Sequence, residues 1–381
     1  MYLPDRAPAL YNTKDRKFEV LTKNPVAPAE PVFPVAAFNS PGYLATRTSA
    51  YCENRNAGYL PLFSYGAVGW FDGTFRSSAI RVDPEPRQDL RLMDMERIVA
   101  NVSAMQQKFS KNRLVKHLSR CALQYGCPAG KNFFLGRYEA PLPSATECNA
   151  RCLGCLSHQQ NDQIPYSQNR IGFTPSPEEI AEVALVHINR VQRAIVSFGQ
   201  GCEGDPLLAA ANIESAIVKI RSATAQGTIN MNTNGSLPDV LKRLLHAGLD
   251  SVRVSINSLR KNCYDGYFRP NGYRFSDVLK SIDLALKNRT FVSINYLNLP
   301  GFTDSPEEVD ALTRFLSDFP IQMIQWRNLN FDPQRYLEQM NRCADQSRPI
   351  GMKPVLTRIR RQFPKIRFGY FNPPKETFKD F

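Results

Sequence analysis

The chain has 381 residues, 43% of them hydrophobic, which suits a globular protein with one large domain and a smaller part. No stretch approaches the roughly 20 apolar residues that a membrane span needs, and the first residues lack the apolar core of a signal peptide. We therefore expect a cytoplasmic protein without a membrane span. The formal charge of +13 suits contact with phosphates or another acidic partner.

The first third of the chain shows little regular alternation. Residues 1–41 contain seven prolines and are predicted to form an extended arm. Residues 42–82 are rich in Tyr, Phe and Gly, which is typical of short strands or an aromatic-lined loop. Apolar residues at near-helical spacing predict a helix over 89–118, followed by a glycine-rich loop over 121–136.

From residue 176 onward, strand-like and helix-like segments alternate. Ser176-Pro-Glu-Glu179 and Ser305-Pro-Glu-Glu308 each predict a helix start in which serine caps, proline follows and glutamate closes a capping box. The alternation predicts a parallel sheet that curls into a complete or partial barrel, with ligands at the carboxyl ends of its strands. We expect strands at 194–198, 228–233, 251–256, 291–297 and 323–329, and helices at 207–226, 237–247 and 275–289.

Three of the nine cysteines lie close together, at Cys148, Cys152 and Cys155. An odd and otherwise scattered set disfavours a secreted disulfide framework. Thiolates are soft ligands, so the spacing of three and then two residues suits zinc or an iron–sulfur cluster. A structural zinc site normally has four ligands, and the fourth is not evident here. An iron–sulfur cubane held by three cysteines has one open iron, which can bind a substrate or cofactor.

Taken with the alternating strands and helices, the triad resembles the radical S-adenosylmethionine (radical SAM) superfamily over residues 147–330. The resemblance implies an α/β fold, a partial (β/α)6 TIM-like barrel, with the triad in the loop after its first strand. It also implies a 4Fe–4S cluster on the three cysteines and S-adenosylmethionine on the open iron. Reductive cleavage there yields a 5′-deoxyadenosyl radical that abstracts hydrogen from substrate, which requires an electron donor such as flavodoxin or ferredoxin. The residues identify no subgroup.

Later segments resemble the cofactor contacts of that superfamily. Gly204-Asp205-Pro206 is similar to the end of its Gly-Gly-Glu-Pro segment, so Asp205 or the adjacent Glu203 is expected to bind the methionine amino group. Residues at the ends of the later strands are expected to complete the S-adenosylmethionine site. They are Thr233, Asn234, Ser255, Asn257, Asn295 and Arg327.

One position departs from the family pattern. The residue before the last cysteine of the motif is commonly aromatic and lies beside adenine, but here it is Gly154. Adenine packing is then expected from Leu153, Leu156 or Phe198.

The remaining cysteines and the histidines leave two readings open. Cys202 lies next to the expected amino-group site, so it is a candidate for substrate chemistry or, alternatively, a small buried hydrophobic residue. Together with Cys202, the residues Cys121, Cys127 and Cys263 raise the question of a second cluster, although Cys121 and Cys127 are too widely spaced for the usual close pair. The four histidines show no metal-ligand spacing, and surface roles are expected for His187 and His246.

The expected organisation is an N-terminal extension (1–130), a radical SAM partial barrel (131–335) and a basic C-terminal segment (336–381). Residues 341–381 carry ten Lys or Arg against three acidic residues, which suits RNA or an acidic partner but equally a solvated basic tail. A peptide, a protein or RNA is the favoured substrate. The alternative is a zinc- or iron–sulfur-containing nucleic-acid-binding protein without radical chemistry.

Overall fold

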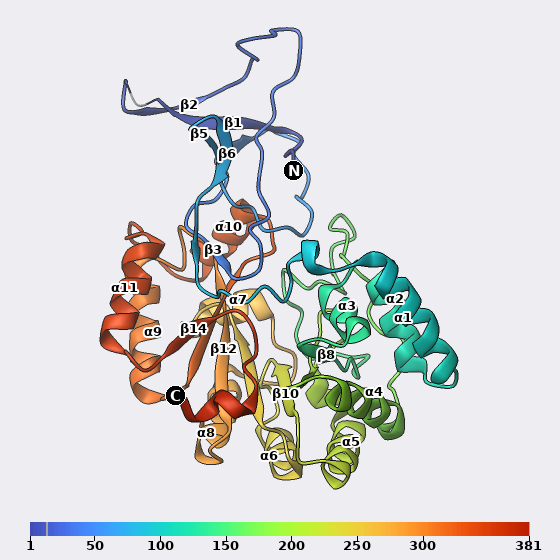
Figure 1. The fold of residues 1–381 in the computed structure, drawn as a ribbon. Helices are drawn as coiled ribbons and strands as arrows, with labels where there is room; N and C mark the ends of the chain where they lie inside the picture. The colour runs from blue at the N-terminus through green and yellow to red at the C-terminus, as the bar shows by residue number, and fades with distance from the viewer. Residues whose placement is uncertain (13, 381) are drawn as a thin grey trace.

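The computed structural model describes residues 1–12 and 14–380. Its centre is a curled parallel sheet with helices on the outer face, and the N-terminal strands β1, β2, β5 and β6 lie beyond one end of that sheet (Figure 1). Within the described ranges, no helix is long and apolar enough to span a membrane.

The parallel sheet has seven strands whose order in space is their order in sequence. This confirms the predicted partial barrel, and β14 from the basic C-terminal segment adds a seventh strand to the six that the resemblance implies. The strands are β8 (Glu139–Pro141), β9 (Ile195–Phe198), β10 (Thr228–Thr233), β11 (Ser251–Ile256), β12 (Phe291–Asn298), β13 (Met323–Asn328) and β14 (Arg367–Gly369).

Helices connect the strands and bury their apolar faces against the outside of the sheet. They are α4 (Pro177–Arg190), α5 (Ala210–Ala223) after the short 3-10 turn η2 (Pro206–Ala209), α6 (Pro238–Ala247), α7 (Lys261–Phe268), α8 (Phe275–Lys287), α9 (Pro306–Asp318), α10 (Pro333–Cys343) and α11 (Met352–Gln362). The last short turn is η3 (Lys375–Asp380).

The two predicted capping boxes differ. At α4 the box is complete, because Ser176 Oγ accepts from Glu179 N and the Glu179 carboxylate accepts from Ser176 N. At α9 only the serine half forms. The Glu308 carboxylate is fully buried and instead accepts hydrogen bonds from Ser258, Arg260 and Tyr296, so tertiary partners replace the local one.

The prediction of one continuous helix over 89–118 is wrong. The chain forms η1 (Leu90–Leu92), α1 (Met95–Lys108) and α2 (Arg113–Leu123), and a turn separates the two α-helices. Asn112 caps α2 by accepting from Val115 N, which the sequence pattern did not reveal. Part of the predicted glycine-rich loop is helical, as α3 (Pro128–Leu135), with proline in its first turn.

The N-terminal region is antiparallel and has a small core of its own, so the expected extended arm is partly regular structure. Its strands are β1 (Arg6–Asn12), β2 (Lys17–Val20), β3 (Tyr43–Ala45), β4 (Tyr51–Glu53), β5 (Val68–Phe71), β6 (Thr74–Ser77) and β7 (Ala79–Arg81). Strand β3 meets the carboxyl ends of β12 and β13, where Asn328 Oδ1 accepts from Ala45 N at 2.8 Å and Asn298 Nδ2 donates to Ala45 O. The region therefore lies over the end of the barrel at which ligands are expected.

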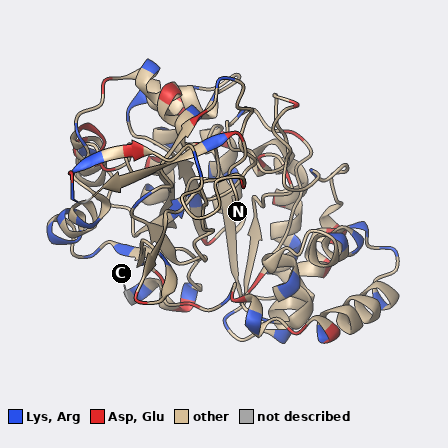
Figure 2. Cartoon of the chain, turned by 90° about the horizontal axis from the view of Figure 1, so that it is seen from above, with Lys and Arg blue, Asp and Glu red and all other residues tan. Residues whose placement is uncertain are grey.

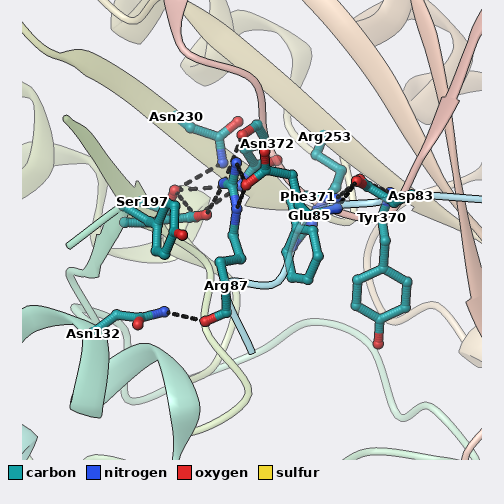
Figure 3. Close-up of polar contacts among 12 residues, drawn as sticks. Asp83, Glu85, Arg87, Asn132, Ser197, Asn230, Arg253, Tyr370, Phe371 and Asn372 are labelled. Atoms are coloured by element: carbon teal, nitrogen blue, oxygen red, sulfur yellow. Dashed lines mark hydrogen bonds and ion pairs between the residues drawn. The ribbon is translucent and has the colours of Figure 1, made fainter. Parts of the chain in front are cut away.

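The open side between β14 and β8 is bridged by segments from both ends of the chain (Figure 3). Asp83 Oδ2 accepts from Tyr370 N at 2.8 Å, and Arg87 Nη1 donates to Asn372 O at 3.1 Å. Asn372 Nδ2 in turn donates to the carboxylate of Glu139 on β8 at 2.8 Å. The residues after β14 thus cross from one edge strand to the other.

The positive charge is not concentrated in one patch. Figure 2 shows Lys and Arg on many elements, with Asp and Glu among them. Within the basic C-terminal segment, Arg358 pairs with Asp310 and Arg360 lies over the Phe368 ring. The segment supplies most of α10, all of α11, strand β14 and the short turn η3 to the fold.

Candidate active site

The three cysteines lie in the long loop between β8 and α4, at the carboxyl end of the sheet. Backbone hydrogen bonds hold this loop to the end of α7. Arg151 N donates to Phe268 O at 2.8 Å, and Leu153 N donates to Tyr267 O at 3.1 Å. The loop between the first and third thiol is therefore fixed from the outside by a helix more than 100 residues later in the sequence.

The chemistry of the three thiols fits an iron–sulfur cluster. All are free and partly buried. Burial raises the pKa of Cys148 to about 12, with a smaller contribution from the Asp205 carboxylate, and burial also raises the pKa of Cys152 well above its usual value. Such thiols ionise only when a metal supplies positive charge. Arg170 Nη2 lies 3.7 Å from Cys155 Sγ and adds positive charge next to the third thiol.

Glu203 and Gly204, from the loop after β9, hold the base of the cysteine loop. Glu203 accepts backbone N–H bonds from Ser144 at 2.7 Å and Ala145 at 3.0 Å, and a further bond from Gln200 N. Burial raises the pKa of Glu203 to about 7, although these donors favour the ionised form. A Cβ at Gly204 would lie 1.7 Å from Glu147 O, so only glycine allows the two loops to approach this closely.

Asp205 joins the cysteine loop region to the end of β10. Its carboxylate accepts from Thr233 Oγ1 at 2.8 Å and from Asn234 N at 2.7 Å. Asn234 Nδ2 donates to Asn149 Oδ1 at 2.8 Å, directly beside Cys148. The predicted residues Glu203, Asp205 and Asn234 thus form one network around the base of the triad. Asn149 is a member that sequence reasoning missed.

Three predicted residues face the interior of the barrel, and one does not. Ser255 and Asn295 pair in register on β11 and β12, and Asn295 Nδ2 lies 3.5 Å from Ser255 Oγ. The Arg327 guanidinium lies 4.1 Å from the centre of the Tyr370 ring. Asn257 is fully buried elsewhere, and its amide donates to Cys263 O and the Tyr336 hydroxyl, between α7 and α10. The structure therefore separates Asn257 from the other predicted site residues.

Arg253 is an interior residue that sequence reasoning missed. It precedes Ser255 by two positions on β11, and Val252 and Val254, its neighbours on either side, are fully buried in the hydrophobic core. Burial, with a contribution from the neighbouring Arg327, lowers the pKa of Arg253 to about 9, so it stays protonated at neutral pH. Its Nε atom has no hydrogen-bond partner among the described residues. The period-two alternation of the strand could have placed it inside the barrel.

The structure also accounts for Gly154. A Cβ there would lie 2.9 Å from the Tyr267 hydroxyl, so a residue of α7 occupies the space of an aromatic side chain at position 154. Asn330 Nδ2 donates to Gly154 O at 3.0 Å on the same side. Phe198, one of the three side chains expected to pack against adenine, is fully buried in the hydrophobic core.

A family model described as the radical SAM superfamily matches residues 142–316. This range begins directly after β8, includes the triad and extends into α9.

Curated relatives match over similar ranges. The chain is 29% identical over 196 residues to a GTP 3′,8-cyclase of Chlorobaculum tepidum, covering 48% of this chain and 54% of that protein. It is 31% identical over 159 residues to a probable GTP 3′,8-cyclase of Thermococcus kodakarensis, covering 42% and 47%. It is 30% identical over 182 residues to the FeMo cofactor biosynthesis protein NifB of Klebsiella pneumoniae, covering 43% and 38%. The chain thus spans about half the length, or less, of these relatives.

Solved structures are similar to this chain at low sequence identity. The crystal structure of a methylornithine synthase is 14% identical, with a TM-score of 0.43 over 74% of this chain and 77% of that one.

Proposed function

We propose that this chain, whose residues 142–316 match the radical SAM superfamily model, is an enzyme of that superfamily that cleaves S-adenosylmethionine reductively and abstracts hydrogen from a substrate inside its barrel. Cys148, Cys152 and Cys155 would hold the 4Fe–4S cluster. When bound, the cluster and S-adenosylmethionine supply the electron transfer and the 5′-deoxyadenosyl radical of that chemistry.

The observation that carries this proposal is the network around the triad. Three loops, after β8, β9 and β10, meet at Glu203 and Asp205, and the two carboxylates are fixed by donors from the other two loops. Because the loops after the next two strands hold the cysteine loop, a cluster on the three cysteines would lie at the carboxyl ends of the strands, where ligands of parallel sheets bind.

The chain's own residues would bind and orient the cofactor. Ser255, Asn295 and Arg327 line the barrel interior beside this network and suit the ribose and the methionine carboxylate. The Glu203–Asp205 segment suits the methionine amino group, through its carboxylates or its backbone carbonyls. Tyr267 takes the place of an aromatic side chain at position 154.

We propose further that the substrate carries a carboxylate or phosphate group. Arg253 faces the interior, its Nη1 donates to Gln325 Oε1, and it forms no salt bridge with a described residue. A buried guanidinium with an unpartnered N–H suits an anion. Peptides, proteins and RNA meet this requirement, and a nucleotide belongs in the same panel because two of the relatives are named for a GTP reaction. A cytoplasmic flavodoxin or ferredoxin would supply the electron.

The test is anaerobic reconstitution of the full chain with iron and sulfide, followed by dithionite and S-adenosylmethionine. We expect release of 5′-deoxyadenosine from the parent protein and none above background from Cys152→Ala. Cys52→Ser is the matched control, because Cys52 is exposed and lies outside the triad. Release at the parent rate by Cys152→Ala would refute the cluster assignment. A colourless parent protein that binds RNA but not S-adenosylmethionine would favour the nucleic-acid-binding alternative.

The substrate class can be tested separately with Arg253→Gln. We expect this variant to release 5′-deoxyadenosine without substrate at the parent rate, but to lose the stimulation that an anionic substrate gives. Arg358→Gln, on the outer surface, is the control. Equal stimulation of the parent and of Arg253→Gln by each member of the panel would contradict the role of Arg253.

A further inference from the structure

A second group of metal-ligating side chains lies outside the triad. Helix α2 carries His117 and Cys121 one turn apart, and the loop after β9 carries Cys202. His117 Nε2 lies 3.4 Å from Cys121 Sγ and 3.5 Å from Cys202 Sγ, and the three ligand atoms all lie within 4.8 Å of one another. All three residues are buried.

We propose that His117, Cys121 and Cys202 bind one zinc ion. Zinc takes imidazole nitrogen at about 2.0–2.1 Å and thiolate sulfur at about 2.3 Å in tetrahedral geometry, which places nitrogen and sulfur roughly 3.6 Å apart. The two nitrogen–sulfur distances match this value without any movement of the chain. On binding, the two thiols release their protons to solvent and become thiolate ligands.

The distances also indicate a single ion rather than a second cubane. Thiolates bound to different irons of a cubane stand further apart than the ligands of one ion, and the triad does not form such a compact group in the described chain. Cys127, whose backbone N–H donates to Cys121 O at 2.9 Å, is adjacent and is the candidate for a fourth ligand.

Ordinary packing does not account for this group. A buried cysteine alone behaves as a small hydrophobic residue. Here, however, both side-chain partners of His117 Nε2 among the described residues are sulfur atoms, which are weak hydrogen-bond partners for an imidazole. The pattern escapes sequence inspection because Cys202 is 85 residues from His117.

The ion would connect the N-terminal helices to the cofactor loop. Cys202 directly precedes Glu203, which binds the backbone at the base of the triad loop. Cys202 O also accepts from Ile171 N at 2.7 Å, so the segment after the triad meets the same point. Zinc at this position would fix the loop after β9 to α2, directly next to the residue that binds the base of the triad loop.

The test is metal analysis of the full chain purified without chelators. We expect about one zinc per chain in the parent protein, and a loss of most of it in His117→Gln and in Cys121→Ser, as the removal of one of three ligands predicts. Both variants should still bind iron after reconstitution. Cys152→Ser should show the opposite pattern, with zinc retained and iron lost. His187→Gln is the matched control, because His187 is a buried histidine whose ring contacts no thiol.

Two results would overturn the proposal. One is a zinc measurement in which the parent protein binds no zinc when zinc is supplied, or in which His117→Gln and Cys121→Ser bind as much zinc as the parent. The other is an intact mass and peptide map that show a Cys121–Cys202 disulfide in protein kept under reducing conditions. If the variants do not fold, cobalt replaces zinc in Cys152→Ser, which lacks cluster absorption. Intense visible bands of tetrahedral cobalt with thiolate ligands support the site, and their absence refutes it. Cys152→Ser keeps the zinc ligands and loses a cluster ligand. Failure of the zinc proposal is therefore distinguishable from failure of the radical SAM proposal.

Discussion

The two cysteine groups of this protein differ in how they are assembled. Cys148, Cys152 and Cys155 come from one loop, so their spacing is visible in the sequence. His117, Cys121 and Cys202 come from a helix and a distant loop, and only folding brings their ligand atoms within 4.8 Å. The first group lies in the loop after β8, at the carboxyl end of the sheet, and the second includes Cys202, next to the Glu203 that binds the base of that loop. Ligands from a single loop leave the other side of a bound cluster free for a cofactor. Ligands from two elements connect those elements when an ion binds.

The largest expected difference between the groups is in catalysis. Cys148→Ala removes a cluster ligand, so release of 5′-deoxyadenosine should fall by at least about 100-fold. Cys121→Ser leaves the triad intact and should reduce release by less than about tenfold, through a less firmly held cofactor loop. Product is measured by liquid chromatography after reconstitution. Equal losses in the two variants would contradict the division of roles.

The close approach between the loop after β9 and the cysteine loop depends on Gly204. Gly204→Ala would place a methyl group 1.7 Å from Glu147 O, and backbone cannot move aside as a side chain can. We expect a loss of about 3 kcal/mol or more in the free energy of unfolding. Urea denaturation measures the loss. Gly172→Ala is the control, because nothing lies within 4 Å of its Cβ; a similar cost in both variants would show that loop approach is not the cause.

The buried histidine without thiol neighbours should make the fold sensitive to acid. His187 is fully buried, which corrects its expected surface role, and burial lowers its pKa from 6.5 to about 4. Between these values the unfolded chain binds the proton and the folded chain does not, so stability falls as pH is lowered. The loss should be on the order of 3 kcal/mol between pH 7 and pH 4.

Urea denaturation at a series of pH values checks this contribution. His187→Gln should remove it, so the difference between the two profiles should follow the expected slope. His246→Gln is the control, because His246 is exposed. Parallel profiles for the parent and His187→Gln would show that His187 does not titrate differently in the folded and unfolded chain.

The smallest expected effect concerns the fit of the triad loop against α7. Gly154→Ala would bring its methyl group to 2.9 Å from the Tyr267 hydroxyl and should cost about 1 kcal/mol. Removing that hydroxyl in Gly154→Ala/Tyr267→Phe should restore most of the loss, since the clash is with the end of a side chain. A double-mutant cycle in urea tests the coupling. Additive costs would mean that Tyr267 does not limit the size of residue 154.

Much of the barrel could be predicted because its cues are local. The strands at 228–233 and 251–256 and the capping box at Ser176 follow from periodicity and short-range hydrogen bonds. Predictions failed where distant groups decided the outcome. Asn112 divides the expected helix, and Glu308 leaves its expected cap for Ser258, Arg260 and Tyr296.

By itself the sequence determined the triad, the parallel sheet and the resemblance to the radical SAM superfamily, since these depend on contiguous spacing and on a repeated strand–helix pattern. Only the tertiary structure decided what surrounds the triad. It brought Glu203 and Asp205 to its base, turned Asn257 away, set Arg253 inside the barrel and joined His117 to Cys202. The physical reason is that hydrogen bonding, ligand geometry and burial depend on distance in space, which chain spacing does not fix beyond a few residues.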